Sequence, residues 1–138
     1  MVNTIDMQDL RHLNLFVKVT RVPTRFCFSY NNALIFCVPK NKVSQSIGKN
    51  AENIRKIGGI IKRRVKVIQK PEGIEDAKWF IEKIVAPVEF KDLEIKDNEM
   101  ILTAGQQSKA ALLGRNKRRL QEMQGIVKDF FGKEFRIV

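Results

Sequence analysis

The sequence repeats itself at an offset of 66 residues, and this repeat limits the possible architectures more than any single motif does. The segment 34–62 aligns without a gap with the segment 100–128. The second copy then holds four additional residues before "FRIV" (135–138) matches "VKVI" (65–68) of the first copy. The sequence therefore predicts two copies of one folding unit.

The boundary between the two copies is expected at residues 70–73, "KPEG", where proline and glycine interrupt the chain and the local charge changes sign. This boundary places the first domain at residues 1–70 and the second at residues 71–138. A chain of 138 residues, of which 43% are hydrophobic, can bury one medium core or two small ones. Two small domains are therefore compatible with the composition.

Apolar spacing predicts the same order of elements in each unit: helix, strand, strand, helix, helix, strand. The opening helix of the first unit would bury Ile5, Leu10, Leu13, Phe16 and Val17. The opening helix of the second unit would bury Ile74, Ala77, Phe80, Ile81 and Ile84, and Pro87 would end it. Strand-like runs occupy 24–30, 33–39, 88–96 and 100–105. Helices of the first unit follow at about 42–47 and 51–61, the latter with Ile54, Ile57, Ile60 and Ile61 on one face. This order predicts an α+β fold with helices on one face of a small mixed sheet.

Asn31 and Asn32 predict a two-residue hairpin turn between the first two strands. In that register Cys27 lies opposite Phe36, so the thiols of Cys27 and Cys37 point to opposite faces of the sheet. Both cysteines are therefore expected to be reduced.

The charge of the chain is strongly positive and unevenly distributed. The formal net charge is +11 and the pI is about 10.0, which favours polyanionic partners such as nucleic acid or anionic lipid, and charge alone does not choose between them. Residues 40–70 hold ten bases and one acid, residues 71–99 hold four bases and nine acids, and residues 100–138 hold eight bases and three acids. The positive charge thus concentrates on the same part of each copy, from the paired helices to the last strand.

A basic, glycine-containing turn lies between the paired helices of each copy, "GKNA" at 48–51 and "GRNK" at 114–117. Such a turn, preceded by an apolar residue and placed in this order of elements, resembles the Gly-x-x-Gly turn of the type II K-homology (KH) module. The tandem pair resembles the archaeal NusA-like family. The resemblance covers essentially the whole chain.

The resemblance implies two type II KH domains that bind single-stranded RNA in transcription termination or elongation control, with RNA polymerase as a further partner. Glycine allows close approach to main-chain amides, and a helix N-terminus attracts phosphate. The predicted RNA-binding residues of the first unit are Ile47, Gly48, Lys49, Asn50, Ala51, Ile54, Arg55, Arg63, Arg64 and Lys66. Those of the second unit are Gly114, Arg115, Asn116, Lys117, Arg118 and Arg119.

Both turns depart from the family pattern at the fourth position, where Ala51 and Lys117 replace the usual second glycine. Alanine adds only a methyl group and starts a helix well. The Lys117 side chain either obstructs the turn or reaches a phosphate itself. The first unit is therefore expected to be the competent RNA site, and both interpretations stay open for the second.

The sequence contains no pattern that predicts catalysis. His12 is the only histidine, and neither a catalytic nor a metal-binding cluster is expected around it. No cofactor and no small-molecule substrate are expected. The apolar runs are far too short to span a bilayer, and acids stand near the N-terminus where a signal peptide would have bases, so a cytoplasmic protein without membrane contact is expected.

Two alternatives remain at this point. A ribosome-associated or RNA-decay adaptor would use the same KH module on another RNA. A protein-interaction scaffold would carry degenerate turns that no longer bind RNA and would dock a basic partner through the acidic segment 71–99.

Overall fold

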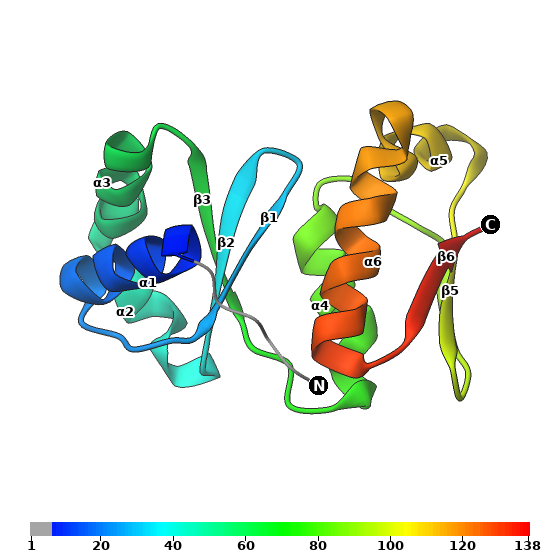
Figure 1. The fold of residues 1–138 in the computed structure, drawn as a ribbon, viewed down its shortest axis with the longest axis horizontal. Coiled ribbons are helices and arrows are strands. Elements are labelled where there is room, and N and C mark those ends of the chain that lie inside the picture. The colour runs from blue at the N-terminus through cyan, green and yellow to red at the C-terminus, as the bar shows by residue number, and fades with distance from the viewer. Residues whose placement is uncertain (1–6) are drawn as a thin grey trace. The chain divides into compact units, whose positions relative to one another are not determined.

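The computed structural model describes residues 7–138 and shows two compact units, one ending at Lys70 and the other beginning at Pro71. Each unit has its own helices and its own sheet (Figure 1). Ile5, which was expected on the first helix, lies outside the described residues.

The described residues of both units follow the predicted order of elements. The first unit consists of α1 (Met7–Thr20), β1 (Phe26–Tyr30), β2 (Ala33–Val38), α2 (Val43–Ile47), α3 (Glu52–Ile61) and β3 (Arg64–Gln69). The second consists of α4 (Ala77–Val85), β4 (Asp92–Ile95), β5 (Glu99–Thr103), α5 (Gln106–Leu113), α6 (Arg118–Phe131) and β6 (Glu134–Ile137). Single 3-10 turns lie at Lys40–Lys42, Lys49–Ala51, Ile74–Asp76 and Arg115–Lys117.

Each unit has a three-stranded mixed sheet. β2 pairs antiparallel with β1 and parallel with β3, and β5 pairs in the same way with β4 and β6. The parallel pair follows from the helical crossover through α2 and α3, which returns the chain to the starting end of the sheet. The predicted α+β fold with small mixed sheets is confirmed.

The first hairpin forms as predicted from its two asparagines. Asn31 and Asn32 have φ angles of 51° and 62°, the pair of positive values that a type I′ turn needs. Cys27 pairs with Phe36 across the strands, and both cysteines are free thiols. The predicted register is confirmed.

The core of the first unit lies between the sheet and helices α1–α3, which cover one of its faces (Figure 1). Leu34, Phe36 and Val38 alternate along β2 and meet α1 through Leu13 and Phe16. The rings of Phe16 and Phe36 stack with their centroids 4.3 Å apart. This alternation is the period of two that a strand requires when one face is packed against helices.

Some residues predicted to be buried are exposed instead. Leu10 and Val17 of α1 are 47% and 36% exposed, and Ile60 of α3 is 56% exposed. Helix α1 packs on the sheet through Leu13 and Phe16, which form a narrow stripe along the helix. Leu10 and Val17 lie beside this stripe and stay exposed.

The second unit shows two further differences from the prediction. Ile74 is 37% exposed and lies in a 3-10 turn ahead of α4, and residues 88–91 lie outside β4. The four additional residues of the second copy lengthen its last helix, since α6 has 14 residues and α3 has 10. Four residues correspond to about one helical turn.

Candidate nucleic-acid interface

The two basic turns follow the same backbone path. In the first turn Gly48 has φ 81° and ψ 167°, and Asn50 and Ala51 are left-handed with φ of 55° and 59°. In the second turn the corresponding φ angles are 75° at Gly114, 55° at Asn116 and 58° at Lys117. The repeat therefore preserves a specific backbone conformation as well as a sequence pattern.

Only glycine suits the first position of this turn. A φ near 80° combined with an extended ψ is a region that residues with a Cβ essentially do not occupy. A Cβ on Gly48 would lie 3.0 Å from the backbone nitrogen of Asn53, and one on Gly114 would lie 2.9 Å from that of Arg119. The chain thus folds back tightly on the start of the following helix in both units.

A side-chain hydrogen bond braces each turn at equivalent positions. Asn53 Nδ2 donates to the carbonyl oxygen of Gln45 at 3.1 Å, and Arg119 Nη1 donates to that of Ala111 at 2.7 Å. Both bonds join the helix after the turn to the helix before it. Arg119, predicted as an RNA-binding residue, is therefore engaged in holding the second turn together.

The turns present main-chain donors at the start of a helix. The first main-chain hydrogen bond of each turn runs from the amide of Ala51 to the carbonyl oxygen of Gly48, and from the amide of Lys117 to that of Gly114, both at 3.1 Å. The amides of the two residues between each pair come before this first bond. Among the described residues, no side chain caps either turn. Amides in this position, at the positive end of the helix dipole of α3 or α6, are suited to bind an anion.

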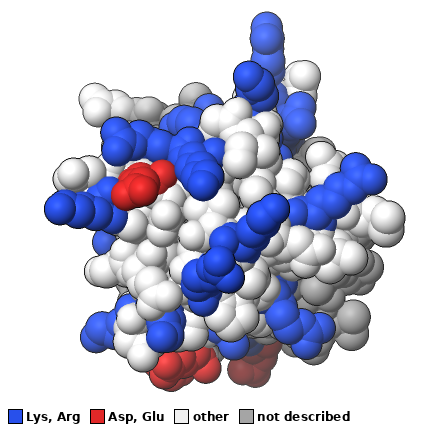
Figure 2. All heavy atoms as spheres, turned by 90° about the vertical axis from the view of Figure 1, so that its left-hand side faces the viewer, with Lys and Arg blue, Asp and Glu red and all other residues white. Residues whose placement is uncertain are grey.

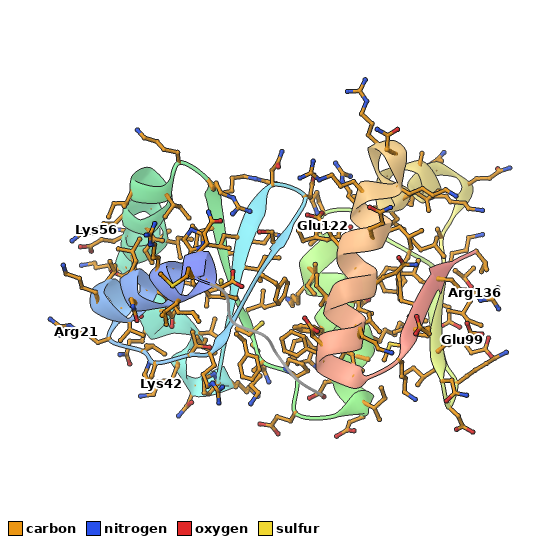
Figure 3. All side chains as sticks on the ribbon, viewed as in Figure 1. Arg21, Lys42, Lys56, Glu99, Glu122 and Arg136 are labelled. Carbon is orange, nitrogen blue, oxygen red and sulfur yellow. The ribbon has the colours of Figure 1, made fainter. Side chains whose placement is uncertain are left out.

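The side chains at the first turn combine positive charge with apolar surface. Lys49, Asn50 and Arg55 are exposed, whereas Ile47 and Ile54 are half-buried beside the turn. The molecular face on the side of α1–α3 shows many Lys and Arg side chains and few acids (Figure 2). Lys42 and Lys56 are labelled on this side in Figure 3.

The second turn carries more exposed positive charge than the first. Arg115, Lys117 and Arg118 are all exposed, and Glu52 occupies the position in the first unit that corresponds to Arg118. Other bases of the second unit are paired with acids: Arg136 Nε lies 3.2 Å from Glu99 Oε2 across the neighbouring strands β6 and β5 (Figure 3). Lys117 has the same left-handed backbone conformation as Ala51. The presence of lysine instead of alanine or glycine at this position therefore leaves the conformation of the turn unchanged.

The structure places Arg63 and Arg64 at the opposite end of α3 from the turn. Arg63 Nη2 donates to Ser29 Oγ at 2.8 Å and to the carbonyl oxygen of Ala33 at 3.3 Å, and Arg64 Nη2 donates to that of Asn31 at 3.2 Å. The ten residues of α3, about 15 Å of helix, separate these side chains from the turn. Both arginines hold the β1–β2 hairpin against the start of β3.

Lys66 also lies away from the turn. Its neighbours Val65 and Val67 pack against the helix-covered core, so the alternation of β3 places Lys66 on the other face of the sheet, in register with Ile35. Burial, with a smaller contribution from the positive charge of Arg64, lowers the pKa of Lys66. The structure thus brings together the predicted turn residues of each unit but not Arg63, Arg64 or Lys66.

One cluster was missed at the sequence level. Asp9 and His12 of α1 lie beside Cys27 of β1, with the three potential ligand atoms within 4.8 Å of one another. No such cluster was expected around His12 from the sequence, and the structure shows one whose spacing could hold a metal ion. The Asp-x-x-His spacing on a helix was a usable signal, since residues three apart share a face, but nothing local to it indicates Cys27.

We expect Ala51→Gly and Lys117→Gly each to raise the free energy of unfolding by roughly 0.5–1 kcal/mol. A left-handed residue with a Cβ costs about 1–2 kcal/mol, and the additional entropy of glycine in the unfolded chain offsets about 0.4–1 kcal/mol of this. Urea unfolding followed by circular dichroism measures the change. As a control, Lys56→Gly on the exposed face of α3 should lower the free energy of unfolding by about 1 kcal/mol. If the turn variants also lost stability, Ala51 and Lys117 would not have the left-handed conformation.

The comparisons with known proteins agree with this fold. No family model matches the chain. The "Probable transcription termination protein NusA" of Methanococcus vannielii is 28% identical over 92 residues, which cover 67% of this chain and 51% of that protein, so the match spans about half of the relative's length. The crystal structure of APE1850 matches 97% of this chain and 99% of its own, with a TM-score of 0.66 and 20% identity.

No described helix is both long and apolar enough to cross a membrane. The match to APE1850 extends over both units and shows a shared fold. The chain thus shares its fold with APE1850 and has a distant sequence similarity to an archaeal protein named as a probable transcription termination protein.

Proposed function

We propose that this chain is a non-enzymatic, single-stranded RNA-binding protein made of two KH domains, residues 1–70 and 71–138, that acts on nascent RNA in transcription termination or elongation. The observation that carries the proposal is the pair of turns at Gly48 and Gly114, which share one strained backbone path and offer uncapped amides at a helix start. These amides, with the exposed bases beside them, form a surface suited to bind phosphate.

In the proposed complex the RNA backbone passes over each turn. The amides of Lys49 and Asn50 donate to a phosphate, and the Lys49 ammonium adds an ionic contact. Glycine at position 48 lets the backbone approach closely. Bases of about four unpaired nucleotides lie along the adjoining surface, where Ile47 and Ile54 supply apolar contact.

Both units are proposed to bind RNA. The second turn has the same path as the first, and the exposed side chains of Arg115, Lys117 and Arg118 surround it with more positive charge. Lys117 then contributes a phosphate contact in place of the close approach that a glycine would allow. Arg119 is assigned to the brace across the turn instead of to RNA.

The role in transcription is supported by the similarity to the Methanococcus vannielii protein, and it implies RNA polymerase as a partner. Immunoprecipitation of the untagged chain from its native host should recover polymerase. Recovery of ribosomal subunits without polymerase would replace the transcription role by a ribosome-associated one.

We expect the double variants Lys49→Asp/Asn50→Asp and Arg115→Asp/Asn116→Asp each to weaken binding of single-stranded RNA about tenfold at ~0.1 M salt, which corresponds to ~1.4 kcal/mol. Each variant places carboxylates where a phosphate should bind. Fluorescence anisotropy of labelled single-stranded and double-stranded RNA over a salt series measures the effect. The wild type should prefer single-stranded to double-stranded RNA. The slope of log affinity against log salt concentration should become shallower by about 0.7 for every phosphate that the variant no longer neutralises.

The matched control is Asn14→Asp/Lys18→Asp, which makes the same change in formal charge at two exposed positions of α1. This control should bind RNA nearly as the wild type does. If its affinity falls as much as that of the turn variants, the binding is a general response to net charge. If none of the three variants changes the affinity, the turns do not bind RNA and the scaffold alternative gains support.

A further inference from the structure

A second candidate site lies in the first unit, between the beginning of α1 and the edge strand β1. Asp9 and His12 are three residues apart on α1 and therefore project from the same face of the helix. Cys27 projects from β1 on the helix-covered side of the sheet, where it packs against the core cluster that includes Phe36. The carboxylate, the imidazole and the thiol thus converge from two elements, with their ligand atoms within 4.8 Å of one another.

The chemistry of this cluster is selective. Thiolate, imidazole and carboxylate together are ligands of Zn²⁺, whereas Mg²⁺ and Ca²⁺ prefer oxygen ligands alone. In a tetrahedral zinc site the metal lies about 2.0–2.3 Å from each ligand atom, so neighbouring ligand atoms are about 3.3–3.7 Å apart. The ligand atoms lie within 4.8 Å of one another, so each pair would have to approach by at most about 1.5 Å to reach this spacing.

Charge and burial are also suitable for a divalent cation. Asp9 is one of only two acids among residues 7–70, the other being Glu52, and it lies beside the histidine of the chain. Asp9, His12 and Cys27 are all half-buried, which shields the ion from solvent while leaving one side accessible. A carboxylate and a thiolate bring two negative charges, which match the charge of the ion.

The second cysteine provides an internal contrast. Cys37 is fully buried, and burial, followed by the nearby Cys27, raises its pKa well above the usual range of a thiol. Its side chain points to the face of the sheet opposite Cys27, because adjacent strand positions alternate. The two thiols are therefore expected to behave differently toward metal ions.

We propose that Asp9, His12 and Cys27 bind one Zn²⁺ ion, with a water molecule as the fourth ligand. The ion joins α1 to β1 and so stabilises the first unit from the side of its edge strand. This site is independent of the basic turns, since α1 contributes no residue to them.

The test uses the full chain without an affinity tag, stripped of metal with a chelator and then titrated with Zn²⁺ or Co²⁺. We expect one Zn²⁺ per chain and a rise in Tm of about 5 °C or more at saturating zinc. Co²⁺ should show a thiolate-to-cobalt charge-transfer band and the strong visible bands of tetrahedral coordination. Mg²⁺ should produce neither stoichiometric binding nor a shift in Tm.

Variants assign the ligands. Cys27→Ser should remove the charge-transfer band, and His12→Gln or Asp9→Asn should weaken the zinc affinity at least tenfold. Cys37→Ala and Glu52→Gln are the controls that keep the band and the stoichiometry, with circular dichroism confirming that every variant is folded. RNA binding should be unchanged by removing zinc.

The proposal is overturned if the wild type binds less than one zinc ion per chain at micromolar concentrations. It is equally overturned if a folded Cys27→Ser or Asp9→Asn variant retains the wild-type affinity and spectrum. Neither result bears on the RNA-binding proposal, which rests on the turns.

Discussion

Gly48→Ala should lower the free energy of unfolding by roughly 3 kcal/mol, the upper end of the cost of one strained backbone conformation. The added Cβ would meet the backbone nitrogen of Asn53 at 3.0 Å as well as the side chain of Asn53, and this backbone belongs to the first turn of α3. Relief of this overlap requires the turn to open. We therefore also expect single-stranded RNA to bind the variant at least as weakly as the Lys49→Asp/Asn50→Asp variant.

The matched control is Gly59→Ala in the same unit. Gly59 is exposed in the middle of α3, and a Cβ there meets nothing within 4 Å. Alanine should stabilise the helix by about 0.5–1 kcal/mol and leave RNA binding unchanged. Urea unfolding and anisotropy titrations on both variants measure the two effects. A Gly48→Ala protein with wild-type stability would show that the turn does not require this backbone conformation.

Phe36→Ala should lower the free energy of unfolding by about 3–5 kcal/mol, the range for removing a large aromatic side chain from a packed core. Phe36 is fully buried on β2, and its ring stacks on that of Phe16 with a centroid distance of 4.3 Å. The truncation leaves a cavity between the sheet and α1, which the neighbouring side chains fill only in part. Urea unfolding followed by circular dichroism and by calorimetry should show the loss in the transition of the first unit.

Ile60→Ala serves as the comparison for Phe36→Ala, because Ile60 is apolar but 56% exposed. We expect a change within about 0.5 kcal/mol, as for most exposed positions. Equal losses at the two positions would mean that Ile60 is buried in solution and that α3 packs through a different face. Together the two substitutions test which apolar residues of the first unit form its core.

The order of elements and the hairpin were predictable because they depend on short-range physical rules. Apolar spacing distinguishes helix from strand over a few residues, and Asn31-Asn32 tolerates the positive φ angles of a tight hairpin. The glycine turns were predictable for the same reason, reinforced by their recurrence at Gly48 and Gly114. Repetition turns a weak local motif into strong evidence of a shared conformation.

Side-chain partners were beyond local rules. Arg63 and Arg64 were predicted to bind phosphate because of their charge, and the fold in addition gives them hairpin oxygens as hydrogen-bond partners. Arg119 was predicted to be a third base beside the second turn, yet its guanidinium braces α5. A guanidinium bonds whichever acceptor the fold brings within reach, and these acceptors lie 8 to 34 residues away along the chain.

The sequence by itself determined the two-unit repeat, the order of helices and strands, the hairpin register and the glycine turns, because periodicity and backbone preferences act over a few residues. Only the tertiary structure decided that Ile60 and Leu10 are exposed, that Arg119 serves as a brace and that Cys27 joins Asp9 and His12. These outcomes depend on contacts between elements that are distant in the sequence. In the first unit Phe16 of α1 stacks on Phe36 of β2, a contact between residues 20 positions apart that no local pattern encodes. In the second unit Arg119 of α6 donates to the carbonyl oxygen of Ala111 in α5.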